Sequence, residues 1–366
     1  MSVLAESLRQ KVSQLLGTLI HQERARIVVP TYGQESGFWF GGGNLAQDES
    51  GTIWLSGRYR NVGDSRTGLE AGQRGLECAI FRSDDGGHTF TKVSFWTKSD
   101  LSVAERIISY EGTALYHRTD GIWELFISSE KDRPYPESLK SYQKPGTGIW
   151  TIDRMTGPSP DRLDPATLAP VLAVTDRPEY LHVKDPVVFE TPSGQTALVF
   201  CSHPFSWSAS NSGLALRAMN TGPFSIASWE MVNRGPCWDV AATRVTDRLR
   251  IPQIGIFRDL PPCSVFFYDG AECIRDHEES ARAHSRPRGY SCEEIGGAFF
   301  GWDEDFPKVE RLSVTAPMFV SPYGSGCSRY VSTLTTEQGI FAVWQQAQTA
   351  GSQPLVGHRL DWESLD

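Results

Sequence analysis

The sequence lacks long hydrophobic runs and clusters of basic residues. No stretch approaches the roughly 20 consecutive apolar residues of a transmembrane helix, so we expect no membrane association and, by default, a cytoplasmic protein. The net charge is -9, and no basic run could neutralise a row of phosphates. Nucleic acid is therefore not an expected partner.

Cysteines and histidines with metal-binding spacing are missing as well. The seven cysteines are scattered without a Cys-x-x-Cys pair, which argues against a disulfide framework and against a zinc knuckle. His117, His203 and His358 have no companions at ligand spacing. We expect reduced, mostly buried thiols, no transition metal and no cofactor.

What the sequence does have is the composition of an all-β protein. It contains 34 Gly, 22 Pro and 11 Trp, and from residue 26 onward short apolar segments alternate with turn residues. Residues 1–25 differ, because apolar residues such as Leu8, Val12 and Leu15 recur there at helical spacing. We predict a short amphipathic helix over 1–25, packed on the side or rim of a single β domain over 26–366.

One short segment indicates the kind of β domain. Residues 83–90, Ser-Asp-Asp-Gly-Gly-His-Thr-Phe, fit the pattern Ser-x-Asp-x-Gly-x-Thr-aromatic. This pattern resembles the Asp box of sialidases and related β-propellers. Physically it is a hairpin turn, in which Ser and Asp side chains accept hydrogen bonds from backbone N–H groups and glycines take positive φ. It marks a fold and not a catalytic site, and an ordinary Asp-Gly-Gly hairpin is the alternative.

The rest of the chain divides into five units of short strands. The predicted strands are 43–47, 53–60, 77–82 and 90–95; 111–118, 123–128, 148–153 and one near 171; 184–190, 196–201, 213–217 and 228–232; 238–246, 254–257 and 264–269, with outer strands beyond a polar insertion at 276–291; and 328–334, 340–345 and 355–360. The last unit is one strand short, and residues 26–30 can complete it from the other end of the chain. Such closure covers free sheet edges. A five-bladed β-propeller results, with a six-bladed, sialidase-like propeller as the alternative.

Candidate site residues lie where the innermost strands begin. In a propeller these strands line a central channel, and their first residues converge at one mouth. Three of the five predicted starts carry a carboxylate, namely Glu111, Asp185 and Asp239. The other two offer Asn44 and Arg329.

Two of these starts resemble motifs of five-bladed propeller glycosidases, the clan of arabinanases, xylosidases, invertases and levansucrases. Residues 109–112 (SYEG) with 120–128 (DGIWELFIS) look like the Glu-Gly-Pro and Gly-x-Tyr-Tyr-Leu-x-x-Ser blade, and 184–189 (KDPVVF) look like the Asp-Pro-x-Val-Phe strand. The two motifs occur here in reversed order, Thr113 replaces the proline, and Asn44 and Gln47 stand where the clan has a catalytic Asp. The resemblance implies a ring of carboxylates in a propeller mouth.

Glycoside hydrolysis gives such a ring a chemical meaning, because it needs one protonated carboxyl group and one ionised one. We predict Glu111 as general acid, Asp239 as base or nucleophile, and Asp185 as the group that orients or tunes them. The structural alternative is that each acid only accepts a hydrogen bond from the neighbouring blade's backbone. The predicted substrate-binding residues are Asn44, Arg58, Arg60, His182, Trp238, Arg244, Arg329 and Tyr330.

The sequence therefore predicts a glycoside hydrolase that acts on a small-molecule or oligosaccharide substrate, with an anionic or furanosidic sugar. A sialidase-like enzyme is one alternative: residues 26–30 (RIVVP) resemble an Arg-Ile-Pro opening, and Arg58, Arg244 and Arg329 could bind a substrate carboxylate. The other alternative is a non-hydrolytic propeller that binds a glycan or catalyses a biosynthetic group transfer.

Overall fold

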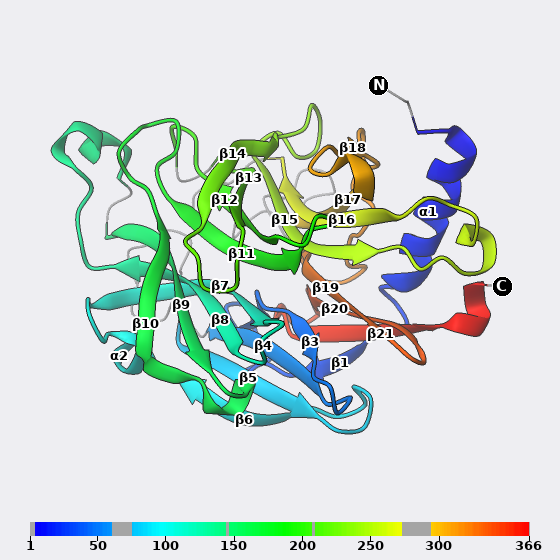
Figure 1. Cartoon of the computed structure of the whole chain (residues 1–366), viewed down its shortest axis with the longest axis horizontal. Coiled ribbons are helices and arrows are strands. Elements are labelled where there is room, and N and C mark those ends of the chain that lie inside the picture. Colours follow the sequence, from blue (N-terminus) through cyan, green and yellow to red (C-terminus); the bar gives the residue numbers. More distant parts are fainter. Residues whose placement is uncertain (1–3, 61–74, 144–145, 207–208, 273–293, 366) are drawn as a thin grey trace.

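The architecture is a ring of five antiparallel sheets around a central axis (Figure 1). The computed structural model describes residues 4–60, 75–143, 146–206, 209–272 and 294–365. Each sheet runs from an innermost strand at the axis to an outer strand at the rim, which is the arrangement of a β-propeller. The prediction of an all-β, five-bladed propeller is confirmed, so the ring has five blades and not six.

The blades follow one another along the chain. Blade I contains β2 (Trp39–Gly41), β3 (Leu45–Gln47), β4 (Ile53–Arg60), β5 (Glu77–Ser83) and β6 (Thr91–Trp96). Blade II contains β7 (Ile107–His117), β8 (Trp123–Lys131), β9 (Ile149–Gly157) and β10 (Asp164–Ala173). Blade III contains β11 (Val183–Glu190), β12 (Thr196–Ser202), β13 (Asn211–Arg217) and β14 (Ser225–Val232). Blade IV contains β15 (Ala242–Arg250), β16 (Cys263–Ala271), β17 (Ile295–Trp302) and β18 (Glu310–Arg311). Blade V contains β19 (Ser328–Thr336), β20 (Gly339–Gln346), β21 (Leu355–Asp361) and β1 (Arg26–Val29).

Short helical segments connect these strands. They are α2 (Lys98–Leu101) and the 3₁₀ segments η2 (Glu137–Tyr142), η3 (Pro160–Arg162), η4 (Gly255–Phe257), η5 (Asp303–Asp305) and η6 (Trp362–Leu365). The segment η4 corrects one prediction, because 254–257 was expected to be a strand. Gly255 has a φ of 47°, and Ile254 N–H donates to the carbonyl of Pro252, so this stretch turns instead of extending.

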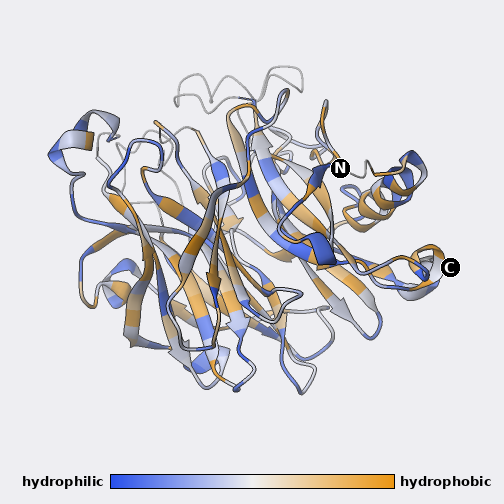
Figure 2. Ribbon diagram, turned by 45° about the horizontal axis from the view of Figure 1, so that its top comes forward, coloured by the Kyte–Doolittle hydropathy of each residue, from blue (hydrophilic) through white to orange (hydrophobic). Residues whose placement is uncertain are grey.

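The second strand of every blade is buried along its whole length. Each residue of β4, β8, β12, β16 and β20 is buried, whereas the outer strands β6 and β14 alternate between exposed and partly buried positions. Neighbouring blades cover both faces of the inner layers, and Figure 2 shows how hydrophobic residues recur along the strands. Polar side chains at the ends of second strands are therefore held away from bulk water.

The ring closes between opposite ends of the chain. β1 pairs antiparallel with β21, with Arg26 opposite Gly357, so the N-terminal strand completes blade V as predicted. The helix α1 (Glu6–Leu19) precedes this strand and buries Val12, Leu15, Leu16 and Leu19 in one core with residues of blades IV and V. Figure 1 shows α1 beside these blades, on the side of the propeller. No helix within the described ranges is long and apolar enough to cross a membrane.

The Ser83–Phe90 segment forms the turn between β5 and β6. Asp85 Oδ1 accepts hydrogen bonds from the N–H groups of His88 and Thr89, each at 2.9 Å, and Ser83 Oγ accepts one from Gly87 N–H. Gly86 and Gly87 have φ values of 71° and 87°. The two side chains and two glycines therefore hold the hairpin by local contacts, at the end of the blade opposite the mouth.

Candidate functional site

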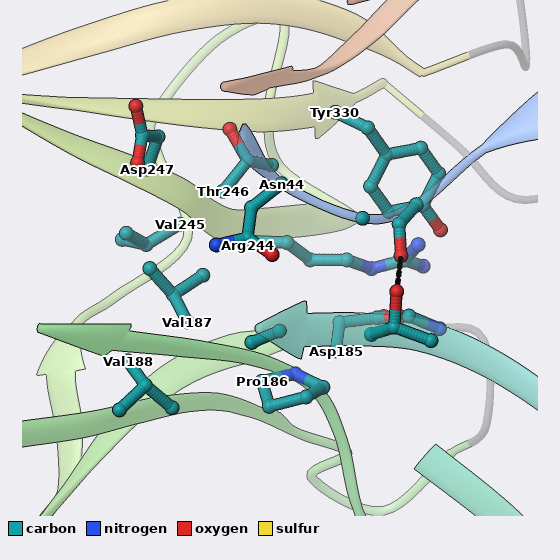
Figure 3. Close-up of a pocket in the computed structure, with 15 residues that line it drawn as sticks. Asn44, Asp185, Pro186, Val187, Val188, Arg244, Val245, Thr246, Asp247 and Tyr330 are labelled. Atoms are coloured by element: carbon teal, nitrogen blue, oxygen red, sulfur yellow. Dashed lines mark hydrogen bonds between the residues drawn. The ribbon is translucent and has the colours of Figure 1, made fainter. Parts of the chain in front are cut away.

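The inner strands of all five blades line one narrow cavity on the propeller axis (Figure 3). Its volume is about 30 Å³, which is room for roughly two water molecules, so a larger ligand has to bind where the strands begin, at the mouth. The side chain of Arg244 runs between Asp185 and Tyr330 in Figure 3. The lining segments are Gly42–Asn44, Gly112–Ala114, Asp185–Val188, Arg244–Asp247 and Tyr330.

Irregular backbone marks the beginnings of the inner strands. The pairing register shifts in β7, β11, β15 and β19 near their first residues. Asp185 and Tyr330 have φ values of 51° and 54°, the left-handed region that costs a non-glycine residue about 1 kcal/mol or more. Bulges redirect side chains, and such strain persists only where the surroundings impose it. This combination is a hallmark of functional sites.

Glu111 and Lys184 form an ion pair across blades II and III. Lys184 Nζ lies 2.8 Å from Glu111 Oε2 and 4.4 Å from the centre of the Trp150 ring. Burial acts to raise the pKa of Glu111, but Lys184, Arg60 and Arg58 outweigh it and hold this pKa well below its usual value. Glu111 is thus an ionised carboxylate at neutral pH. That state suits a base or nucleophile, which disfavours the predicted role of general acid.

Asp185 contacts the residue that follows Glu111 in the chain. Asp185 Oδ1 accepts the N–H of Gly112 at 3.2 Å, and Oδ2 accepts the thiol of Cys201 at 3.3 Å. Cys201 Sγ is also 3.5 Å from His203 Nε2. Asp185 forms no ion pair in the described part of the chain. The hydrogen bond from Gly112 N–H to Asp185 is the kind of backbone contact with a neighbouring blade that a purely structural role of Asp185 predicts.

A second carboxylate at the mouth binds two arginines. Glu294, just before β17, pairs with Arg244 of β15 and, at 2.6 Å, with Arg329 of β19. Burial acts to raise the pKa of Glu294, but the two guanidinium groups outweigh it and lower this pKa to about 2. Glu294 therefore links blades IV and V at the mouth as an ionised carboxylate at neutral pH.

Two further arginines, Arg58 and Arg60, enter the mouth from the end of β4. Arg60 lies over one side of the Trp39 ring at 4.6 Å, and Arg329 lies 4.8 Å from the same ring. Arg58 and Arg329 both contact the ring of Tyr330, at 5.8 and 5.1 Å. Guanidinium groups and aromatic rings thus alternate across blades I and V. Arg58, Arg60, Arg244, Arg329 and Tyr330 are all at the predicted mouth.

Asn44 and His182 are also near the axis, but their contacts are internal. Asn44 Oδ1 accepts the N–H of Leu115 at 2.7 Å, which joins blade I to blade II. His182 Nδ1 is 2.8 Å from the hydroxyl of Tyr135, and its ring lies 4.3 Å from that of His203. Burial, then the charge of Lys184, lower the pKa of His182 well below its usual value. His182 is therefore a neutral, buried group.

Asp239 and Trp238 do not join this cluster. The inner strand of blade IV begins at Ala242, not at Trp238, because Gly235 N–H closes a turn onto the Asp239 carbonyl. Asp239 is fully buried and pairs with Arg311, and its Oδ2 accepts the Tyr268 hydroxyl at 2.8 Å. Trp238 packs on Tyr268 and donates to the Ser313 carbonyl. A substrate cannot reach Asp239 in this structure, so its predicted catalytic role is not supported.

Sequence reasoning missed Glu294, Cys201, Trp39 and Trp150. One signal could have found Cys201, because the second strand of a blade returns to the mouth where the first begins. Cys201 stands opposite Lys184 in the β11–β12 ladder, just as Asp269 stands opposite Arg244 in β15–β16. The ends of the second strands are therefore part of the mouth. Glu294 was missed because the outer strands of blade IV were predicted only as lying beyond the insertion at 276–291, although the first residues of a third strand also lie at the mouth.

Comparisons with known proteins relate this fold to other structures. No protein-family model matches the chain, and no curated protein matches it. A solved structure described as a glycoside hydrolase has a TM-score of 0.66 at 9% identity, covering 97% of this chain and 95% of that one. A β-xylosidase has a TM-score of 0.56 at 8% identity (93% and 95%), and an α-L-arabinofuranosidase from Lactobacillus brevis has 0.54 at 11% identity (92% of both chains). The predicted resemblance to five-bladed glycosidases is thereby confirmed as a likeness of fold.

Proposed function

We propose that this protein is a glycoside hydrolase whose carboxyl pair is Glu111 and Asp185. The observation that supports it is the contact between the Glu111–Gly112 and Lys184–Asp185 segments of adjacent blades, which brings two carboxyl groups to one mouth. The likeness of fold to proteins described as a glycoside hydrolase, a β-xylosidase and an α-L-arabinofuranosidase adds support for hydrolysis, and the last of these for a furanosidic sugar.

The two carboxyl groups would divide the chemistry according to their surroundings. Glu111, ionised by Lys184, would attack the anomeric carbon or remove a proton from water. Asp185, the second carboxyl group at the mouth, would serve as the general acid that donates a proton to the leaving oxygen. Arg58, Arg60, Arg244 and Arg329 would stabilise negative charge around the substrate. These roles differ from those predicted from the sequence because Asp239 is enclosed in blade IV.

A panel of aryl glycosides tests this proposal, including α-L-arabinofuranoside, β-D-xyloside and β-D-glucuronide. We expect Glu111→Gln and Asp185→Asn to lower kcat on the cleaved substrate at least 100-fold, because each removes an acid, base or nucleophile. Azide should restore turnover to Glu111→Ala but not to Asp185→Gln, with a glycosyl azide as product. The exposed Glu230 of β14 provides the control Glu230→Gln, which should keep wild-type activity.

Two results would contradict the hydrolase. One is turnover of no glycoside in the panel by the wild type. The other is unchanged activity in both Glu111→Gln and Asp185→Asn. Either result would favour the non-hydrolytic propeller, which is also consistent with both oxygens of Asp185 accepting hydrogen bonds from Gly112 and Cys201.

A further inference from the structure

We infer that the mouth contains a preformed carboxylate-binding site, built by Arg58 and Arg60, and that the hydrolase acts on an acidic sugar. The inference rests on the proposed function and names its substrate class. It starts from a contrast in how the arginines at the mouth are satisfied. Arg244 and Arg329 share Glu294, whereas Arg58 and Arg60 have no ion pair within the ranges that the structure describes.

The side chain of Arg58 is buried with donors left over. Arg58 is 1% exposed, yet its Nε and Nη1 have no hydrogen-bond partner among the described residues. Arg60 is 8% exposed, and its Nε is likewise without a partner. Buried charged donors are normally paired, because an unpaired one forfeits its hydration without compensation. Such donors at a mouth are explained by a ligand, because the residues that the structure describes provide no partner for them.

The local charge balance also favours an anion. Five cationic side chains meet here with three carboxyl groups: Glu111 pairs with Lys184, Glu294 pairs with Arg244 and Arg329, and Asp185 forms no ion pair within the described ranges. Burial, then the charge of Arg58, lower the pKa of Arg60 to about 9, so the cluster is crowded with positive charge. A bound carboxylate would relieve this repulsion.

The aromatic rings fix the arginines before any ligand arrives. Trp39 contacts both Arg60 and Arg329, and Tyr330 contacts both Arg58 and Arg329. These contacts hold the planar guanidinium groups in place and reduce the entropy lost on binding. Planar forks of N–H donors match the planar, two-oxygen geometry of a carboxylate.

Gly42 leaves the unpartnered side of Arg58 open. It lines the axial cavity and has a φ of 72°, and a Cβ added there would lie 3.5 Å from Arg58 Nε. Any side chain at this position would therefore fill the space beside the free donor. Free donors and positive charge therefore meet beside this small cavity, which is what a ligand carboxylate requires.

Isothermal titration calorimetry with monosaccharides tests the inference without depending on turnover. The probes are D-glucuronate and D-galacturonate, each compared with its neutral counterpart D-glucose or D-galactose, together with inorganic phosphate. We expect at least one uronate to bind 10-fold or more tightly than its neutral counterpart. Arg58→Met should weaken that binding at least 10-fold, and Arg58→Lys should recover only part of it, because a single ammonium cannot replace the fork.

A stability measurement separates loss of the site from loss of the fold. Arg58→Met removes a buried, unpaired charge, so we expect the melting temperature to stay the same or to rise. Arg82, on β5 at the opposite end of the same blade, is exposed and pairs with Asp84. Arg82→Met is the matched control and should leave uronate binding unchanged.

Three outcomes would overturn the inference. They are equal affinity for uronates and neutral sugars, absence of uronate binding with or without phosphate binding, and uronate binding that survives Arg58→Met and Arg60→Met. The proposed hydrolase fails separately. Uronate binding that depends on Arg58, without cleavage of any glycoside, would support the carboxylate-binding site and contradict the hydrolase. Cleavage of neutral glycosides without a preference for uronates would support the hydrolase and contradict the carboxylate-binding site.

Discussion

Two groups of buried arginines in this molecule are satisfied in opposite ways. At the far ends of the strands, Glu124 of β8 accepts two hydrogen bonds from Arg217 of β13, at 2.9 and 2.7 Å, and one from Arg154 at 3.1 Å. Arg118 lies 3.7 Å from the same carboxylate. At the mouth, Arg58 and Arg60 form no ion pair with any carboxylate of the described residues, and both leave donors without a hydrogen-bond partner. The Glu124 carboxylate accepts hydrogen bonds from within the chain and links blade II to blade III. The unpartnered donors of Arg58 and Arg60 are the ones that we infer bind a ligand.

The difference between the two groups shows that burial alone does not tell whether a charged side chain stabilises the fold or binds a ligand. Glu124 and Arg217 are both inaccessible, as is Arg58, so exposure does not separate the two groups. What separates them is ion pairing within the described residues: Arg217 donates both Nη groups to Glu124 and leaves only Nε without a partner, whereas Arg58 leaves Nε and Nη1 without partners and forms no ion pair there. An internally satisfied cluster stabilises the fold only weakly compared with apolar packing, but breaking it is costly. An unsatisfied cluster should be dispensable for folding and necessary for binding.

The largest expected effect is on the Glu124 cluster. Glu124→Gln leaves three guanidinium groups around a neutral amide, so we expect the free energy of unfolding to fall by about 3–5 kcal/mol. Urea denaturation measures this change. The control Glu230→Gln, on the exposed face of β14, should stay within about 0.5 kcal/mol. If the free energy of unfolding fell no further for Glu124→Gln than for the control, the contrast with the arginines at the mouth would be wrong, because the paired cluster would also be dispensable for folding.

The next effect is a pH dependence within the mouth itself. The pKa of Glu294 is lowered to about 2, below its ordinary value of 4.5, so its stabilisation is complete above about pH 5 and is lost as the pH falls towards 2. Urea denaturation from pH 7 to pH 3 should show a loss of about 2–3 kcal/mol from such a carboxylate. Glu294→Gln should flatten this slope, and Glu230→Gln should not. An unchanged slope in Glu294→Gln would show that its arginines do not depend on it.

The smallest effect concerns the neutral side chains behind the mouth. Cys201 donates its thiol to Asp185, and burial, then the charge of Asp185, raise the pKa of Cys201 well above its usual value. We expect Cys201→Ala to lower kcat/KM on the cleaved glycoside about 3- to 10-fold, because one hydrogen bond that orients Asp185 is lost. Cys201→Ser keeps a donor and should lie within about threefold of the wild type. Equal losses in both variants would point to packing and not to orientation of the carboxyl group.

The sequence was sufficient for features that depend on local chemistry. The strand alternation, the turn at Ser83–Phe90 and the strand that completes blade V were all predicted, because turn residues and periodicity act over a few neighbours. The placement of Glu111 and Asp185 at one mouth followed from the start of each inner strand. Asp239 was misplaced because blade IV begins a few residues later than expected, at Ala242. A shift of that size moves a side chain from the axis into the blade wall.

Features set by contacts between distant segments were not predictable. Glu294 reaches Arg244 and Arg329 from 50 and 35 residues away, and no local pattern precedes it. The Nε and Nη1 donors of Arg58 are without partners because no carboxylate of the described residues comes within hydrogen-bond distance of them, and this depends on how the blades are arranged. These contacts can be seen only in the folded propeller, because each joins two residues that are far apart in the sequence.

The pairing of β1 with β21 has a consequence for biosynthesis. Arg26 is synthesised before blades I to IV, whereas its partner Gly357 is synthesised after them. Blades I to IV can each assemble from continuous chain, but the last sheet must wait, and until then an unpaired edge is open to other nascent chains. The ring therefore closes only after β21 has been synthesised. We expect a chaperone to have its largest effect on folding before β1 pairs with β21.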